Sequence, residues 1–512
     1  MNITRRVIPA AAILAAGFLP MTSLAALAAP AAPASAPAKP DDFNGDGFRD
    51  LAVGAPTMDV GTVSRAGAVN IAYGAASGLN TAKHQSVSQG SPGVPGARET
   101  GDRFGASVAS GDFDRDGYAD LAIGSPGEAI GTDANAGSVT VIYGSATGLS
   151  DRSTVFNQGT GGVPGSVAAD HYFGSAVAAG DVNGDGYPDL AVTANGGAVA
   201  DDSATVLYGG PNGLTGTNAT ALQKPPASDL PQKDGEDQYL DAFGNDVTIA
   251  DANHDGKGDV FVSSNAKSVE PEVMTSDPGV SYYAGASGGA SAERTKYLDD
   301  AGFTLAHGDV NGDGTDDVVA AYGGDEFTQS RVVVLSGSAS GPSQTQRFNQ
   351  DTAGVPGSEE LGDGFGTSLA LGDVNGDGKA DLAVGAPGED SGAGSGEGRV
   401  TLLRGSASGV AYTGATTYDQ DTSGVPGTGE AGDLFGLGLA LTDVNNDGHA
   451  EMAVGSPGEN GTGTADQRDG DGSVTFFKGS ASGPSLTGVA QFGAATLGGV
   501  TKHANFGNPI AQ

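Results

Sequence analysis

The sequence predicts an all-β fold: a seven-bladed β-propeller whose ring is closed by pairing of its N- and C-terminal segments. Three observations predict this fold, namely an acidic pattern that recurs seven times, four short strand-like runs in each repeat, and almost no helical periodicity. Gly occupies 88 of the 512 positions without a G-X-Y period, which favours many short strands joined by tight turns over a collagen helix.

The acidic pattern reads Asp-x-(Asn/Asp)-x-Asp-Gly-x-x-(Asp/Glu). Successive copies start roughly 58 to 70 residues apart, which indicates an array of similar supersecondary units. The first residues of the seven copies are Asp42, Asp112, Asp181, Asp251, Asp309, Asp373 and Asp443.

The repeats share further short sequence motifs. Phe-Gly precedes the acidic pattern in most repeats, as at Phe104, although the fifth repeat keeps only Phe303. An apolar run follows the pattern and ends in Gly-Ala-Pro or Gly-Ser-Pro, as at Gly385. A third run such as 139–143 precedes a Gly-containing turn, and a fourth leads into Gly-Val-Pro-Gly, as at Gly424. Four strands with turn residues between them make each repeat one blade of a propeller.

The two ends of the repeat array complement each other. The acidic pattern at Asp42 has no Phe-Gly strand before it, and Phe506-Gly507 has no acidic pattern after it. Together they make one complete repeat, so we expect the C-terminal strand to complete the blade begun at Asp42. Such closure hides the sheet edges that an open array would expose.

The acidic patterns predict metal sites. Side-chain oxygens at positions 1, 3, 5 and 9, with a backbone carbonyl at position 7, surround one hard cation, and Gly at position 6 allows the sharp turn. All-oxygen ligation favours Ca²⁺, with up to seven ions, and the alternative is an Asp-rich turn without metal. The predicted ligands are Asp42, Asn44, Asp46, Phe48 and Asp50; Asp112, Asp114, Asp116, Tyr118 and Asp120; Asp181, Asn183, Asp185, Tyr187 and Asp189; Asp251, Asn253, Asp255, Lys257 and Asp259; Asp309, Asn311, Asp313, Thr315 and Asp317; Asp373, Asn375, Asp377, Lys379 and Asp381; and Asp443, Asn445, Asp447, His449 and Glu451.

These patterns differ from an EF-hand, which needs a bidentate Glu at position 12, where this chain has apolar residues such as Val53. The flanking segments read as strands, so we expect each loop to cap a β-hairpin.

The N-terminus predicts export. Arg5 and Arg6 precede an apolar run, and a small-residue cleavage site follows, so we assign 1–28 as a signal peptide. The Arg pair leaves the general and twin-arginine routes both open. An Ala/Pro-rich spacer spans 29–40 and the propeller 41–512. We expect a secreted, extracellular monomer without a membrane or wall anchor.

Composition excludes several functions. The formal charge is −38, with 62 acidic and 24 basic residues, which argues against nucleic acid as a partner and points to cations. The chain has no Cys, so it has no disulfide, no thiolate nucleophile and no zinc–thiolate site.

The order of Phe-Gly, acidic pattern and Gly-Ala-Pro resembles the FG-GAP repeats of integrin α-chain N-terminal propellers and their secreted bacterial relatives. The resemblance covers 41–506 and implies seven blades, Ca²⁺ in the loops between the first and second strands of each blade, and ligand recognition on the opposite face. Repeats three to five depart from it, because they lack Gly-Ala-Pro and read 193–195, 263–265 and 320–322 instead. No leg domains, membrane span or inserted domain are expected, so only the binding module carries over.

We therefore expect a binding or adhesion module for an extracellular glycan or protein ligand. Candidate ligand loops follow Gly-Val-Pro-Gly, and the alternative is that their acids only cap and solvate strand entrances. These acids are Glu99, Asp102, Glu360, Asp363, Glu430 and Asp433.

An enzyme is the second hypothesis, and a purely structural role is the third. No nucleophile elbow, zinc-protease motif or phosphate loop is present, and no catalytic residue is assigned. His171 and His307 precede acidic loops and are a weak catalytic hint. Asp-rich calcium loops also occur on the propellers of polysaccharide lyases, so a calcium-dependent lyase is the enzyme alternative.

Overall fold

The structure is a computed structural model. It describes Met1 and residues 37–196, 202–230, 238–268, 276–324, 329–390, 395–459, 470–499 and 503–511. Ser35–Gln512 forms one compact unit. The predicted signal peptide and all of the predicted spacer before residue 37, apart from Met1, lie outside the described residues.

Strands of this unit form seven antiparallel sheets in the described part of the chain, and strands that follow one another in sequence are neighbours in each sheet. The first three sheets hold β1 (Leu51–Ala55), β2 (Ala68–Tyr73) and β3 (Asn80–Val87); β4 (Ser107–Gly111), β5 (Asp120–Ser125), β6 (Ser138–Ile142) and β7 (Ser153–Phe156); and β8 (Phe173–Gly180), β9 (Asp189–Ala194), β10 (Ser203–Tyr208) and β11 (Thr215–Leu222). The fourth and fifth hold β12 (Gln238–Ala250), β13 (Asp259–Ser268), β14 (Ser276–Tyr283) and β15 (Lys296–Leu298); and β16 (Thr304–Gly308), β17 (Asp317–Tyr322), β18 (Arg331–Ser336) and β19 (Ser343–Phe348). The last two hold β20 (Ser368–Gly372), β21 (Asp381–Ala386), β22 (Arg399–Ser406) and β23 (Gly409–Tyr418); and β24 (Gly438–Thr442), β25 (Glu451–Ser456), β26 (Ser473–Phe477) and β27 (Ala490–Phe492).

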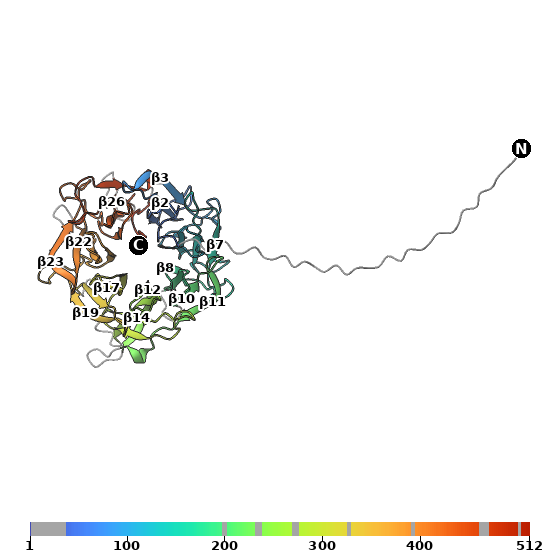
Figure 1. Cartoon of the computed structure of the whole chain (residues 1–512), viewed down its shortest axis with the longest axis horizontal. Helices are drawn as coiled ribbons and strands as arrows, with labels where there is room; N and C mark the ends of the chain where they lie inside the picture. Colours follow the sequence, from blue (N-terminus) through green and yellow to red (C-terminus); the bar gives the residue numbers. More distant parts are fainter. Residues whose placement is uncertain are drawn as a thin grey trace. The chain divides into compact units, whose positions relative to one another are not determined.

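The sheets of this unit lie side by side around a common centre, as the predicted seven-bladed propeller requires (Figure 1). Two short 3₁₀ turns, Ala227–Asp229 and Ala494–Leu497, are the only helical segments among the described residues. Neither is long or apolar enough to cross a bilayer, so the described residues contain no candidate membrane-spanning helix.

Burial explains why the second strand of each repeat reads as an unbroken apolar run. Every residue of β5 and of β21 is buried, because neighbouring sheets cover both faces of the strand. The fourth strands lie at the rim, and β3 and β19 are accordingly exposed at most positions. The core therefore lies between sheets: Leu402 of the sixth sheet packs in one cluster with Val454 and Phe477 of the seventh.

The Phe-Gly and Gly-Ala-Pro motifs meet between neighbouring sheets. A Cβ added to Gly385 would clash with the backbone carbonyl of Gly436, and Gly124 stands in the same relation to Gly174. The hydroxyl of Ser107 also donates to the carbonyl of Gly174 over 2.9 Å. Gly is required at these positions because the backbones of adjacent blades approach too closely for any side chain.

The C-terminal segment closes the ring. The N–H of Gly54 donates to the carbonyl of Pro509 over 2.8 Å, the N–H of Ala511 donates to the carbonyl of Ala52 over 2.9 Å, and Ile510 pairs with Val53. Residues 507–511 thus add the missing inner strand to the three-stranded first sheet, which confirms the predicted closure.

One local expectation was wrong for the first acidic loop. Six loops join the first and second strands of a sheet directly, as expected of a hairpin. The first loop instead precedes β1, and its inner strand comes from the opposite end of the chain, so no covalent hairpin surrounds it.

Candidate metal centre

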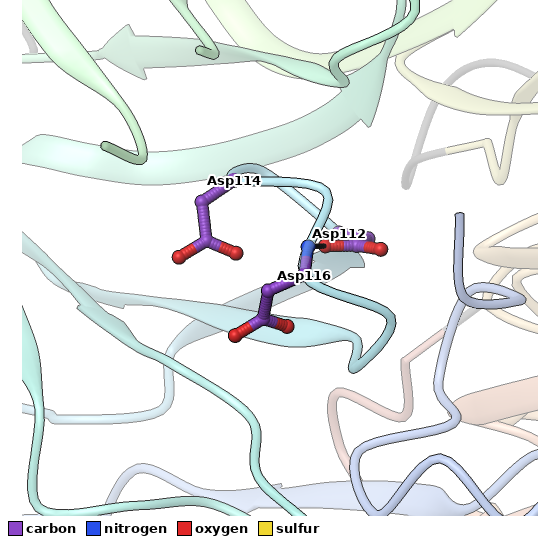
Figure 2. A group of neighbouring side chains, drawn as sticks. All are labelled: Asp112, Asp114 and Asp116. Carbon is purple, nitrogen blue, oxygen red and sulfur yellow. Dashed lines mark hydrogen bonds between the residues drawn. The ribbon is translucent and has the colours of Figure 1, made fainter. Parts of the chain in front are cut away.

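The second acidic loop, between β4 and β5, brings three carboxylates together. One oxygen from each of Asp112, Asp114 and Asp116 lies within 4.8 Å of the others (Figure 2). Asp112 is buried, Asp114 is half-buried and Asp116 is exposed, so the group opens from the sheet toward solvent. Predicted positions 1, 3 and 5 are therefore adjacent in space.

Hydrogen bonds within the loop create this arrangement. The carboxylate of Asp112 accepts the N–H groups of Asp116 and Gly117, each over 3.0 Å. Asp116 in turn accepts the N–H of Tyr118 over 3.1 Å. Gly117 adopts φ +96°, the left-handed region that a side chain at position 6 would strain.

The same wrapping recurs in the other six loops. In each, the first carboxylate accepts the backbone N–H groups of the residues four and five positions later. These carboxylates belong to Asp42, Asp181, Asp251, Asp309, Asp373 and Asp443. The seven predicted loops therefore share one backbone design.

Position 9 is buried and anchors the loop to its sheet. Asp120 is fully buried and accepts the N–H of Phe113 at one oxygen and the N–H of Gly144, which follows β6, at the other, both over 2.9 Å. Asp50 makes the equivalent pair of bonds with the N–H groups of Phe43 and Gly74. These bonds connect the loop to the end of the third strand, a role that the sequence pattern does not reveal.

Burial is also the main cause of the raised pKa of the carboxyl group at position 9. The pKa of Asp120 is raised to about 9 and that of Asp50 to about 8, mainly by burial and in smaller part by the other carboxylates of each loop. Burial likewise raises the pKa of Asp189 and of Glu451 to about 7. Glu at position 9 of the seventh loop therefore sits in the same environment as Asp in the others.

The donor chemistry fits a hard cation. Besides the bonds described, a buried oxygen of Asp114 and one of Asp259 have no hydrogen-bond partner, and neither does the amide oxygen of Asn445. Buried carboxylate and amide oxygens without partners are costly unless a cation satisfies them, and Ca²⁺ takes such ligands in flexible geometry.

Basic side chains enter some loops. Arg152 pairs with Asp114, and its guanidinium lies 3.6 Å from the centre of the Tyr143 ring. Lys257 approaches its own loop's Asp255 at 3.3 Å, and Lys379 approaches Asp377 at 3.5 Å. These cations offset part of the negative charge, so the loops are not electrostatically equivalent.

The end of the predicted spacer also contacts the loops. The N–H of Ala38 donates to Asp112 over 2.9 Å, and the ammonium of Lys39 donates to Asn446 over 2.6 Å. Residues just before the first sheet thus lie against two loops from different sheets.

The acids that follow Gly-Val-Pro-Gly lie at the other ends of the strands. Asp433 precedes the first strand of its sheet, and Glu459 follows the second, so both are at the ends remote from the acidic loop. The structure adds a partner that sequence reasoning missed, because the amide of Gln420 donates to Glu459 over 2.6 Å. Gln350 and Glu389 form the same pair over 2.7 Å. The sequence feature that could have pointed to this Gln is the Phe-Asn-Gln or Tyr-Asp-Gln that recurs at the end of the fourth strand.

The two histidines singled out from the sequence lie in different settings. His307 is exposed to a central cavity of about 760 Å³ and lies 2.8 Å from the hydroxyl of Thr248, and desolvation inside the ring lowers its pKa. His171 lies 2.8 Å from the amide oxygen of Gln158, between two blades. The structure does not join them into one site.

Comparison with known proteins agrees with the repeat pattern. The FG-GAP repeat family matches residues 36–69, 104–142, 173–208, 365–403 and 435–477. Integrin alpha-5 of Xenopus laevis is 36% identical over 177 residues, 33% of this chain and 15% of the relative. Phosphatidylinositol-glycan-specific phospholipase D of Rattus norvegicus is 34% identical over 166 residues, 32% of this chain and 18% of the relative. Integrin alpha-PS5 of Drosophila melanogaster is 34% identical over 158 residues, 30% of this chain and 14% of the relative.

The matched part of this chain thus spans less than a fifth of each of these relatives. Among solved structures, rhamnogalacturonan lyase YesW overlaps 88% of this chain and 69% of its own, at 10% identity and a TM-score of 0.35. A Bacillus licheniformis rhamnogalacturonan lyase covers the same shares at 11% identity and a TM-score of 0.34. These TM-scores are too low to relate the proteins by function.

Repeat order, seven-sheet architecture and family matches therefore agree. The chain carries FG-GAP repeats and is similar over about a third of its length to integrin alpha chains.

Proposed function

We propose that this protein is a secreted propeller that binds Ca²⁺ at its acidic loops and recognises an extracellular glycan or protein ligand. The observation that carries the proposal is the same hydrogen-bonded wrapping in all seven acidic loops. Three carboxylates lie close together in the second loop, and three of the loops hold a buried oxygen without a hydrogen-bond partner. The similarity to integrin alpha chains supports a binding role. Export through a signal peptide at 1–28 and a spacer at 29–40 completes the proposal.

Bound Ca²⁺ would supply the charge that the loops need. Each loop gathers several carboxylates within a short segment, and their mutual repulsion opposes folding until a cation offsets it. An ion that binds only the folded state raises stability by mass action. The rigid sheets would then present the connections at the opposite strand ends to the ligand, as scaffolds of this kind do.

The first experiment measures thermal unfolding of the mature protein, residues 29–512, with Ca²⁺, after chelation, and after addition of Ca²⁺ or Mg²⁺. We expect a large loss on chelation that Ca²⁺ restores and Mg²⁺ restores poorly. An unchanged unfolding midpoint, with no bound calcium by elemental analysis, would refute the metal assignment.

The second experiment addresses the ligand. The calcium-loaded protein is applied to a glycan array and to immobilised extracellular matrix proteins, with the chelated protein as the control. Calcium-dependent binding to either surface supports the binding module. Release of unsaturated sugars from acidic polysaccharides, with no retained binding, would instead favour the lyase alternative.

A further inference from the structure

A second kind of acidic cluster lies between the sixth and seventh sheets, at the strand ends remote from the acidic loops. Carboxylate oxygens of Glu430, Asp433 and Glu459 lie within 4.8 Å of one another. Asp433 is only 1% exposed, and it accepts the backbone N–H of Glu430 over 2.8 Å. Within the described ranges, no basic side chain forms an ion pair with any of the three.

A buried amide oxygen faces this cluster. Gln420 is 2% exposed and donates its amide N–H to Glu459, but its own oxygen is buried without a hydrogen-bond partner. The third repeat shows where this oxygen points. There His171 replaces the Asp that stands two residues before the Phe of Phe-Gly, and its ring nitrogen lies 2.8 Å from the oxygen of the equivalent Gln158. By this equivalence the oxygen of Gln420 would face the Asp433 position.

Other sheets place a cation at the equivalent position. In the fourth sheet Lys267 replaces the Glu that stands eight residues after the last acid of the loop. Its ammonium lies 2.8 Å from Asp241, the residue equivalent to Asp433. In the sixth sheet Glu389, equivalent to Glu459, pairs with Arg399 over 2.5 Å.

The first sheet has apolar residues in place of the polar ones. Met58, Ala494 and Ala504 stand where Glu459, Gln420 and Asp433 stand in the seventh, and all three are buried in an apolar cluster. The first sheet thus replaces all three polar residues together, whereas the third and fourth replace them singly and bring in a basic side chain. A fold requirement alone does not explain the polar set of the seventh sheet, because the same boundary packs with an apolar set in the first.

We propose that Glu430, Asp433, Glu459 and the amide oxygen of Gln420 bind a divalent cation, with Ca²⁺ as the preferred ion. Three carboxylate oxygens and one amide oxygen are ligands for a hard cation, and no nitrogen or sulfur donor is among them. The ion takes the place of the ammonium of Lys267 in the fourth sheet. It connects the segment after β23 of one blade to the segments before β24 and after β25 of the next.

Crystals soaked in Mn²⁺ test this site directly, because the anomalous signal locates the ion. We expect a peak bounded by Glu430, Asp433 and Glu459, and competition by Ca²⁺ should reduce it. Direct hydrogen bonding between the carboxyl groups, with no anomalous peak between them, would overturn the proposal. Peaks in the acidic loops are read separately in the same map, so failure of this site and failure of the proposed function remain distinguishable.

Two variants add a solution test by elemental analysis. Glu459→Lys copies the fourth sheet, so it should lose a single ion per chain, and chelation should then lower its thermal unfolding midpoint less than that of the parent. Asp433→Asn should lose the same ion without supplying a substitute cation. Glu293→Lys, an exposed residue far along the chain from the cluster, makes the same charge change and should keep the parent ion count. A parent ion count in both Glu459→Lys and Asp433→Asn would also overturn the proposal.

Discussion

The guanidinium of Arg404 lies 2.9 Å from the carboxylate of Asp381, the last acid of the sixth acidic loop. Asp381 is fully buried, and its other oxygen accepts the N–H of Gly405 over 2.9 Å. The sixth loop therefore carries a cation of its own at a predicted ligand. A basic group so close to an ion site competes with the ion for the carboxylate.

We predict that Arg404→Gln raises the Ca²⁺ affinity of the sixth loop roughly tenfold, equal to about 1.4 kcal/mol. In chelator the same variant should unfold more readily than the parent, since a buried carboxylate has lost its partner. Occupancy of the sixth loop, refined from crystals equilibrated at graded Ca²⁺, measures the change.

The matched control is Lys478→Gln. Lys478 precedes Gly479 as Arg404 precedes Gly405, but its ammonium donates to the carbonyl of Ser77 over 2.9 Å. The Lys478→Gln variant should keep the Ca²⁺ affinity of the seventh loop close to that of the parent. Equal occupancy of the sixth loop in Arg404→Gln and parent crystals would show that the ion pair does not oppose binding.

Variants of Asp120 and Asp116 can separate two roles within one loop, namely anchoring the loop to its sheet and binding the ion. Asp120→Ala leaves the N–H of Gly144 without an acceptor, at about 1–3 kcal/mol, and removes one of two acceptors of the N–H of Phe113, so it should destabilise the protein with or without Ca²⁺. Asp116 is exposed, so Asp116→Ala should cost much less in chelator and show its main effect with Ca²⁺ present. Chemical denaturation of both variants in both conditions measures this. Equal losses in chelator would mean that position 9 is no more structural than position 5.

Local spacing explains what the sequence could predict. Asp112, Asp114 and Asp116 alternate within one turn, so their convergence follows from the pattern itself. Ring closure was predictable because the first repeat lacks a strand that the C-terminus carries. The pair of Gln420 and Glu459 could not be predicted, because the two residues are 39 positions apart and belong to neighbouring sheets. Arg404 and Asp381 likewise meet only once the third strand lies beside the second.

Because the C-terminal segment closes the ring, we predict that a polar substitution at an apolar position in this segment strongly lowers stability. Ile510 is 5% exposed, pairs with Val53 and belongs to the apolar cluster of the first sheet. Ile510→Asp buries a charge there and should destabilise the protein by about 3 kcal/mol or more, while exposing β1 as an edge strand that promotes association. Thermal unfolding and light scattering measure the two effects. Asn508→Asp, in the same segment but half-buried, should change both far less; similar values for the two variants would argue against closure as a source of stability.

Asp246, which lines the central cavity, should make the free energy of unfolding depend on pH. Its carboxylate accepts the N–H groups of Val247 and Leu305 over 2.8 and 2.9 Å, joining the fourth sheet to the fifth. Burial raises its pKa to about 6, above the value of about 4 expected in the unfolded chain. The other titratable groups that line the cavity are Arg49, His307, Asp373 and Asp443.

The sign of the effect follows from the direction of that shift. A protonated Asp246 is favoured in the folded state, so its contribution to stability is fully present below pH about 4 and is lost as the pH rises through about 6. Asp246→Asn cannot ionise, so the free energy of unfolding should fall less steeply between pH 4 and 6 than in the parent. The measurement is chemical denaturation across this range in chelator, which keeps ion release out of the comparison. Asp151→Asn, at an exposed position, should keep the parent slope. If Asp246→Asn also keeps the parent slope, the proton taken up on folding belongs to another carboxyl group.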